Sequence, residues 1–114
     1  MISGRTQNLG VIGYPIAHSL SPLMQNAALQ QASLDYRYIA MPVLPENLRQ
    51  AVLGLKVLSF RGFNVTIPHK TAIMPLLDEI QSDAEKIGAV NTVVNQKGHL
   101  VGYNTDVTGF LAAM

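Results

Sequence analysis

Residues 9–22 of the chain read LGVIGYPIAHSLSP and begin the first strand–loop–helix unit of an α/β pattern. The apolar run at residues 9–12 is closed by Gly13, which is typical of a buried strand. Ser21 and Pro22 then supply a helix N-cap and a first-turn proline, so a helix is predicted from there to about residue 33. A buried strand, a loop and a helix make up the repeating unit of an α/β domain.

Strands and helices continue to alternate along the chain. Residues 36–41 and 63–67 are rich in aromatic and branched side chains and are predicted to be strands, with a helix opened by Pro45 between them. Pro68 and Ser82 are each predicted to start a further short helix. Strands that are linked through helices run parallel, and the helices then cover both faces of the sheet.

The C-terminal part of the chain predicts a hairpin. Residues 90–95 and 100–104 flank the turn sequence QKGH at 96–99, in which the glycine lies near the left-handed position. A last helix is predicted to begin at Thr105 or Asp106 and to run to the end of the chain. The predicted fold class is therefore α/β, a three-layer α/β/α domain with a mostly parallel sheet and one antiparallel strand from the C-terminal hairpin.

Composition and charge exclude several classes of protein. The 114 residues suffice for one domain, and 48% hydrophobic residues with a formal net charge of +1 argue against disorder and against a nucleic-acid partner. Charged residues make up only 13%, and Ser, Thr, Asn and Gln outnumber them. No apolar run spans a bilayer and the N-terminus is too polar for a signal peptide, so a cytoplasmic protein without a membrane partner is predicted. Without Cys, and with three scattered His, no metal site is predicted.

The loop after the first predicted strand carries two serines. Ser19 and Ser21 are two residues apart in a segment expected to be extended, so both hydroxyls would point to one side, beside free N–H groups at a helix start. Such donors suit a carboxylate. On the residues alone, the alternative that Ser21 is only an N-cap and Ser19 only a loop residue stays open.

The third predicted strand ends with a polar face. Asn64 and Thr66 share this face by the two-residue period, opposite apolar side chains, and they suit the binding of hydroxyl groups. Lys70 follows in a predicted first helical turn, where the helix dipole disfavours its charge, so both a functional role and a solvated surface lysine stay open. His69 is predicted to be a packed or capping histidine.

Two further polar residues precede and follow the predicted hairpin. Asn91 opens a strand although Asn is a poor β-former, which indicates that its amide is needed. Asp106 is well placed as a first-turn acid of the last predicted helix. Lys70 and Asp106 each follow a strand, so they could meet across a cleft at one sheet edge and share proton transfer on a substrate hydroxyl.

Gly10 and Gly13 do not form a nucleotide-binding loop. Their spacing is not that of a dinucleotide fingerprint, no P-loop lysine follows, and Pro15 interrupts a direct entry into a helix. No cofactor-binding residue is therefore predicted in this chain.

Four motifs taken together resemble the substrate-binding domain of shikimate dehydrogenases, in the family's order and from about residue 9 to residue 114. These motifs are SLSP at 19–22, NVTIPHK at 64–70, NTVV at 91–94 and GYNTD at 102–106. The resemblance implies an NADP-dependent oxidoreductase that acts on a CH–OH group and reversibly reduces 3-dehydroshikimate to shikimate. Such an enzyme belongs to the shikimate pathway, which leads to chorismate and the aromatic amino acids.

The resemblance also implies roles for individual residues. Ser19 and Ser21 would hold the substrate carboxylate. Lys70 and Asp106 would be the catalytic pair, with Lys70 in contact with the substrate as proton donor to the developing alkoxide. The residues expected to bind the ring hydroxyls of the substrate are Asn64, Thr66, Asn91 and Asp106.

The family places NADP on a second, C-terminal Rossmann-like domain, which residues 1–114 do not supply. We therefore expect the chain to be the N-terminal shikimate-binding domain alone, which binds no cofactor, adjoins that second domain in the full-length protein and is inactive by itself. Two alternatives stay open: the same domain of a quinate/shikimate dehydrogenase, and a non-catalytic shikimate-binding module.

Overall fold

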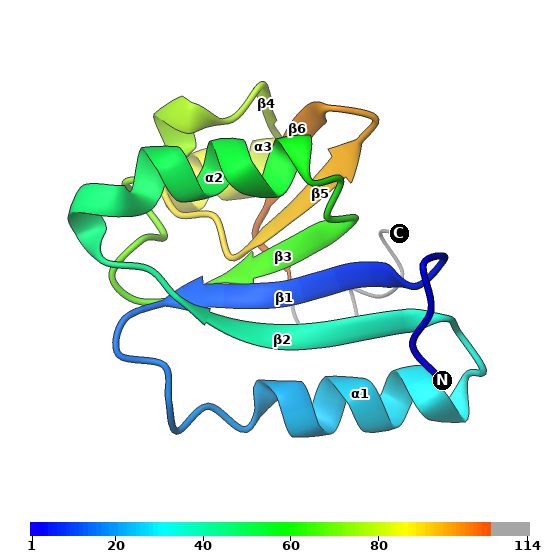
Figure 1. Ribbon diagram of the computed structural model, residues 1–114. Helices are drawn as coiled ribbons and strands as arrows, with labels where there is room; N and C mark the ends of the chain where they lie inside the picture. The colour runs from blue at the N-terminus through cyan, green and yellow to red at the C-terminus, as the bar shows by residue number, and fades with distance from the viewer. Residues whose placement is uncertain (106–114) are drawn as a thin grey trace.

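The computed structural model describes residues 1–105, so the predicted last helix lies outside the described residues (Figure 1). In chain order the elements are β1 (Gln7–Gly13), α1 (Ser21–Gln31), β2 (Tyr36–Pro42), the 3-10 helix η1 (Pro45–Asn47), α2 (Leu48–Val57), β3 (Gly62–Val65), the 3-10 helix η2 (Met74–Leu76), β4 (Glu79–Ile80), α3 (Ser82–Ile87), β5 (Thr92–Gln96) and β6 (His99–Tyr103).

The strands of the described region form one six-stranded sheet in the order β2-β1-β3-β5-β6-β4. β1 pairs in parallel with β2 and β3, and β4 pairs in parallel with β6. Of these six strands only β5 is reversed, since it pairs antiparallel with both β3 and β6. The prediction of a mostly parallel sheet with one antiparallel strand from the C-terminal hairpin is confirmed.

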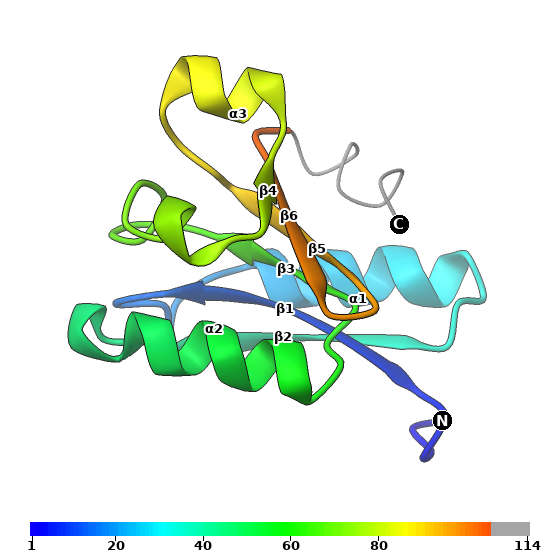
Figure 2. The same cartoon turned by 90° about the horizontal axis from the view of Figure 1, so that it is seen from above.

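Apolar clusters fill the space between the sheet and the helices on its two faces. Figure 2 shows α1 and α2 on opposite faces of the sheet. The larger cluster contains Val52 of α2, Phe63 of β3 and Ala84 of α3. The smaller cluster packs Leu29 of α1 against Val11 and Tyr38. The three-layer arrangement follows, because each face of the sheet needs its own helical cover.

The second helix packs on the sheet through an apolar stripe, which its sequence predicts from four apolar residues at helical spacing, Leu48, Val52, Leu55 and Leu58; three of the four are buried. Leu48, Val52 and Leu55 are buried at the i, i+4, i+7 spacing of one helix face. Leu58 follows the last helical residue and is 69% exposed. The helix therefore ends one residue before the stripe would have continued.

The two-residue turn of the C-terminal hairpin is confirmed. Lys97 and Gly98 have φ values of 54° and 92°, and positive φ at both central residues defines the type I′ turn that matches the twist of hairpin strands. The Gly98 N–H donates to Asn95 Oδ1 at 2.8 Å, which holds the turn against β5.

Two predicted local features are wrong. Residues 68–73 form turns rather than a helix, and the following helical segment is only η2, which contains Pro75. The predicted serine caps fail as well, because Leu20 and Gln81 occupy the N-cap positions of α1 and α3 without side-chain capping bonds. Lys70 consequently does not lie in the first turn of a helix, and the dipole argument for its charge does not apply.

Candidate functional site

The candidate site lies at one edge of the sheet, where β1 and β3 end (Figure 1). Because β5 is antiparallel to β3, the start of β5 lies at the same edge. In open α/β sheets, ligands bind outside the carboxyl ends of the strands. Six of the predicted site residues lie on loops, at strand ends or at the start of α1 at this edge, namely Ser19, Ser21, Asn64, Thr66, Lys70 and Asn91. Asp106 lies outside the described residues.

Asn64 is the centre of a hydrogen-bonded group that joins three strands. Its Oδ1 accepts a hydrogen bond from the Tyr38 hydroxyl at 2.7 Å. Its Nδ2 donates to Thr92 Oγ1 at 3.2 Å and to the carbonyl oxygen of Asn91 at 3.3 Å. Asn64 is half-buried and stands directly opposite Thr92 in the pairing of β3 with β5. The predicted polar face of the third strand is thus present at Asn64.

Asn91 uses its side-chain amide to hold the chain that leaves β6. Its Nδ2 donates to the carbonyl oxygen of Thr105 at 2.6 Å, and its Oδ1 accepts from the Thr105 N–H at 2.9 Å. The Thr92 hydroxyl also donates to Asn91 Oδ1, at 2.9 Å. The amide of Asn91 is therefore required structurally, and it fixes the residue that immediately precedes Asp106 in the sequence.

Thr66 follows β3 and packs tightly on the end of β1. Its N–H donates to the carbonyl oxygen of Ile12 at 3.0 Å. Gly13 allows the close approach, because a Cβ atom at Gly13 would overlap the Thr66 methyl group. The glycine pair noted in the sequence thus has a packing role, since a Cβ at Gly10 would likewise lie 2.5 Å from the carbonyl oxygen of Ile39. Both glycines lie within β1, so they are not placed in a loop after the strand, where the glycines of a dinucleotide fingerprint lie.

Ser19 and Ser21 lie together at the N-terminus of α1. The Ser21 N–H donates to Ser19 Oγ at 3.2 Å, while the Ser19 N–H donates to the carbonyl oxygen of Ile16 at 3.0 Å. Both serines are half-buried. Ser19 therefore satisfies one of the unpaired N–H groups of the helix start, a local structural role that the sequence alternative had given to Ser21 instead.

Lys70 and His69 are neighbours with opposite surroundings. The Lys70 side chain is exposed, and its carbonyl oxygen accepts from the Val90 N–H at 2.8 Å, which holds this turn beside the segment entering β5. The His69 side chain is buried, with Nε2 2.6 Å from the carbonyl oxygen of Val43. The prediction of a packed histidine is confirmed, and its contact anchors the turn that carries Lys70.

Tyr38 and Thr92 are site-associated residues that were not identified from the sequence. Both side chains are buried, at 1% and 0% exposure, so they reach the site only through Asn64 and Asn91. Burial raises the pKa of the Tyr38 phenol well above its ordinary value, which keeps it a hydroxyl donor. Thr92 had an available signal, because it adjoins Asn91 within the NTVV motif. Tyr38 had none, since β1 separates its strand from that of Asn64.

Two other kinds of feature were searched for in residues 1–105. No group of three or more His, Cys, Asp or Glu side chains there is arranged to hold a metal ion. None of the helices in the same part of the chain has the length and apolar character needed to cross a bilayer.

The mixed sheet with helices on both faces makes this an α/β domain, and polar side chains gather where β1 and β3 end. Residues 11–93 match the family model of the shikimate dehydrogenase substrate binding domain. This match covers most of the chain, and the chain belongs to that family.

Individual relatives agree with this assignment. The chain is 58% identical to the shikimate dehydrogenase (NADP(+)) of Geobacter metallireducens, over 99% of its own length and 40% of the relative. A crystal structure of shikimate dehydrogenase in complex with NADP+ is 53% identical with a TM-score of 0.91, covering 96% of this chain and 38% of that one. Shikimate 5-dehydrogenase of Listeria monocytogenes, solved with shikimate and NAD, is 46% identical with a TM-score of 0.90, covering 98% and 39%. The chain spans about 40% of the length of the Geobacter relative.

Proposed function

We propose that this chain binds shikimate and 3-dehydroshikimate as part of an NADP-dependent shikimate dehydrogenase. The observation that carries the proposal is the gathering of uncharged hydrogen-bonding side chains around Asn64 at the sheet edge, in a chain of this family. The name of the Geobacter relative and the shikimate in the Listeria structure support the choice of substrate. A ring that carries several hydroxyls needs groups that both donate and accept, which amide and hydroxyl side chains provide.

Each predicted site residue receives a role in this proposal. Ser19 and Ser21 bind the substrate carboxylate at the N-terminus of α1, where the helix favours an anion. The ring hydroxyls are bound by Asn64, Thr66, Asn91 and, outside the described residues, Asp106. NADP is assigned in this proposal to the second domain expected in the full-length protein, since Gly10 and Gly13 lie within β1 rather than in a dinucleotide-binding loop.

Lys70 is the proposed proton donor, with Asp106 as its catalytic partner. Reduction of a ketone requires a proton on the carbonyl oxygen, and the exposed Lys70 side chain is accessible to a ligand at the sheet edge. Contacts of its own turn with Val90 and Val43 fix the backbone from which the amine extends.

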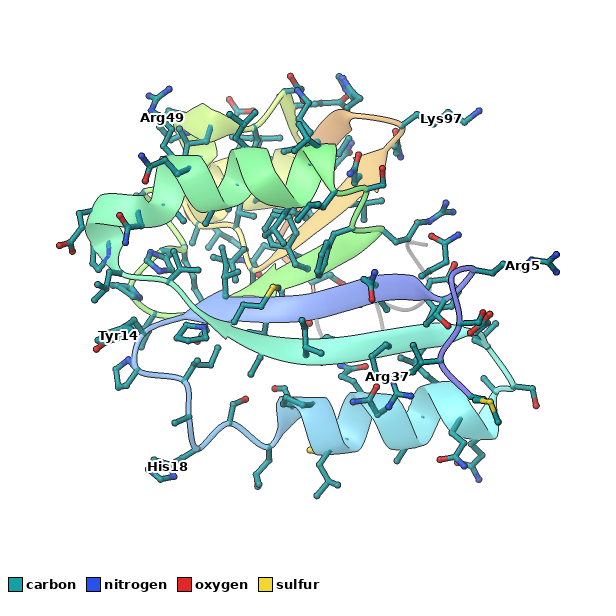
Figure 3. The ribbon with its side chains drawn as sticks, viewed as in Figure 1. Arg5, Tyr14, His18, Arg37, Arg49 and Lys97 are labelled. Atoms are coloured by element: carbon teal, nitrogen blue, oxygen red, sulfur yellow. The ribbon has the colours of Figure 1, made fainter. Side chains whose placement is uncertain are left out.

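Replacement of Lys70 in the full-length protein tests this proposal. We expect Lys70→Ala to lower kcat by roughly a hundred-fold to ten-thousand-fold, with a smaller change in KM, because a general acid is lost. Lys97→Ala is the matched control, since Lys97 lies on the hairpin tip (Figure 3). Unchanged kcat in Lys70→Ala would contradict the role of Lys70.

Replacement of both serines tests carboxylate binding separately. We expect Ser19→Ala with Ser21→Ala to raise KM for shikimate and to change kcat less. An unchanged KM would count against a carboxylate site at α1. Comparable turnover of quinate would indicate a quinate/shikimate dehydrogenase, and shikimate binding without turnover in the full-length protein would indicate a non-catalytic module.

A further inference from the structure

A continuous chain of hydrogen bonds runs behind the proposed site. It begins at the Tyr38 hydroxyl, passes through the Asn64 amide and the Thr92 hydroxyl, and reaches the Asn91 amide. The Asn91 amide then bonds twice to the backbone of Thr105. The chain therefore links β2, β3, β5 and the end of β6.

Backbone groups set the direction of every bond in this chain. The Thr105 N–H can only donate, so the Asn91 atom that faces it is the oxygen, and this oxygen also accepts a hydrogen bond from the Thr92 hydroxyl. The Asn91 carbonyl oxygen can only accept, so the Asn64 atom that faces it is the nitrogen. The Asn64 oxygen is then left to accept from Tyr38.

The bond directions have a consequence for the ligand. An amide side chain offers a donor on one end and an acceptor on the other, and a flipped amide presents the wrong group to a substrate hydroxyl. The flip of Asn64 is disfavoured because its oxygen would then face the Asn91 carbonyl oxygen and the Thr92 hydroxyl, whose hydrogen is already donated to Asn91. Both residues are buried, so they act through Asn64 rather than by touching the ligand.

We propose that Tyr38 and Thr92 are positioning residues: their hydroxyls hold the Asn64 and Asn91 amides in place for substrate binding, with the donor and acceptor ends that the backbone groups dictate. This inference rests on the proposed function of the site. Tyr38 reaches Asn64 across β1, the strand between them. In the strand pairing Tyr38 lies opposite Leu9 of β1, and Asn64 lies opposite Val11 of β1. Thr92 stands directly opposite Asn64 and orients both amides at once.

Thr92 offers the cleaner test, because two substitutions separate its hydroxyl from its size. We expect Thr92→Val in the full-length protein to raise KM for shikimate roughly ten-fold, while Thr92→Ser stays within about two-fold of the unchanged protein. KM for NADPH should not change in either variant. All kinetics are measured well below the melting temperature of each variant, so that loss of folded protein does not enter.

Tyr38→Phe provides the second variant, with Tyr36→Phe as its control on the same strand. We expect Tyr38→Phe to raise KM for shikimate several-fold and Tyr36→Phe to leave it unchanged. If both residues act through Asn64, the Tyr38→Phe, Thr92→Val double variant raises KM by less than the product of the two single effects.

The outcomes separate this inference from the proposed function. If the unchanged full-length protein neither binds nor turns over shikimate, the proposed function fails. If it is active but Thr92→Val and Thr92→Ser have the same KM for shikimate, the positioning role is refuted. Equal rises in KM for shikimate and for NADPH would also refute it, because they would indicate a general structural defect.

Discussion

Replacement of Gly13 by alanine tests the packing that places Thr66 at the site. The added Cβ would overlap the Thr66 methyl carbon Cγ2 and would lie 3.1 Å from the carbonyl oxygen of Ile67. Gly13 is not among the residues with positive φ, so the expected penalty is steric rather than conformational. Overpacking of this kind costs about 1–3 kcal/mol. For a domain of this size, we expect the melting temperature to fall by about 5–15 °C.

Gly54→Ala is a matched control with an effect of opposite sign. Gly54 lies within α2, and nothing lies within 4 Å of the position that its Cβ would occupy. Because alanine is the better helix former, we expect this variant to gain up to about 1 kcal/mol. Thermal unfolding followed by far-ultraviolet circular dichroism measures both variants.

A second substitution identifies the atom responsible. Thr66→Ser removes the methyl group that an alanine at position 13 would overlap, yet keeps the hydroxyl assigned to the substrate. We expect Thr66→Ser to restore part of the stability lost in Gly13→Ala, because the contact with the Ile67 carbonyl oxygen remains. Equal melting temperatures for Gly13→Ala and the unchanged protein would refute this account. If Thr66→Ser restores no stability to Gly13→Ala, the methyl carbon of Thr66 is not the atom that the new Cβ overlaps.

Two further predictions concern stability. His69→Leu leaves the carbonyl oxygen of Val43 without its partner, so we expect the free energy of unfolding, measured by urea denaturation, to fall by about 1–3 kcal/mol. The control His18→Leu changes an exposed residue and should leave the free energy of unfolding unchanged. Equal losses in the two variants would contradict the anchoring role of His69. The pKa of Asp78 is lowered, chiefly by the Leu100 N–H that donates to its carboxylate at 2.7 Å. The Asp78 carboxylate therefore stabilises the folded protein fully at pH values well above the ordinary pKa of 3.8, and this stabilisation is lost as the pH falls below that value. We expect Asp78→Asn to make the free energy of unfolding depend less on pH on the acid side. An unchanged acid side would show that Asp78 is not a source of the pH dependence.

Local patterns predicted most of the sheet but not all of it. The apolar run of β1 and the turn residues Lys97 and Gly98 carry signals within a few residues, and both predictions hold. β4 has only two residues, and it forms because it pairs with β6 about twenty residues later. Turns replace the helix predicted from Pro68, and His69 is buried there in contact with the carbonyl oxygen of Val43, a long-range contact that a local rule for prolines does not contain.

The candidate site shows the same division. The two-residue period placed Asn64 on a polar face, and the poor strand propensity of Asn91 indicated a required amide. The hydroxyls of Tyr38 and Thr92 belong to the same group, but their part in it depends on which strands lie side by side and in which register. That information is distributed over residues 38–92 and has no local signature.

The reversed strand β5 also makes the domain amenable to labelling. Its hairpin begins and ends at the edge that carries Asn91 and Thr105, so the tip at Lys97 and Gly98 projects from the opposite end of the sheet (Figure 3). A fluorophore or a short epitope inserted at this tip would move with the strands that hold the proposed substrate groups while lying at the opposite end of the sheet from them (Figure 3). The hairpin thus provides an attachment point for reporting ligand-dependent motion without occupying the surface proposed for the substrate.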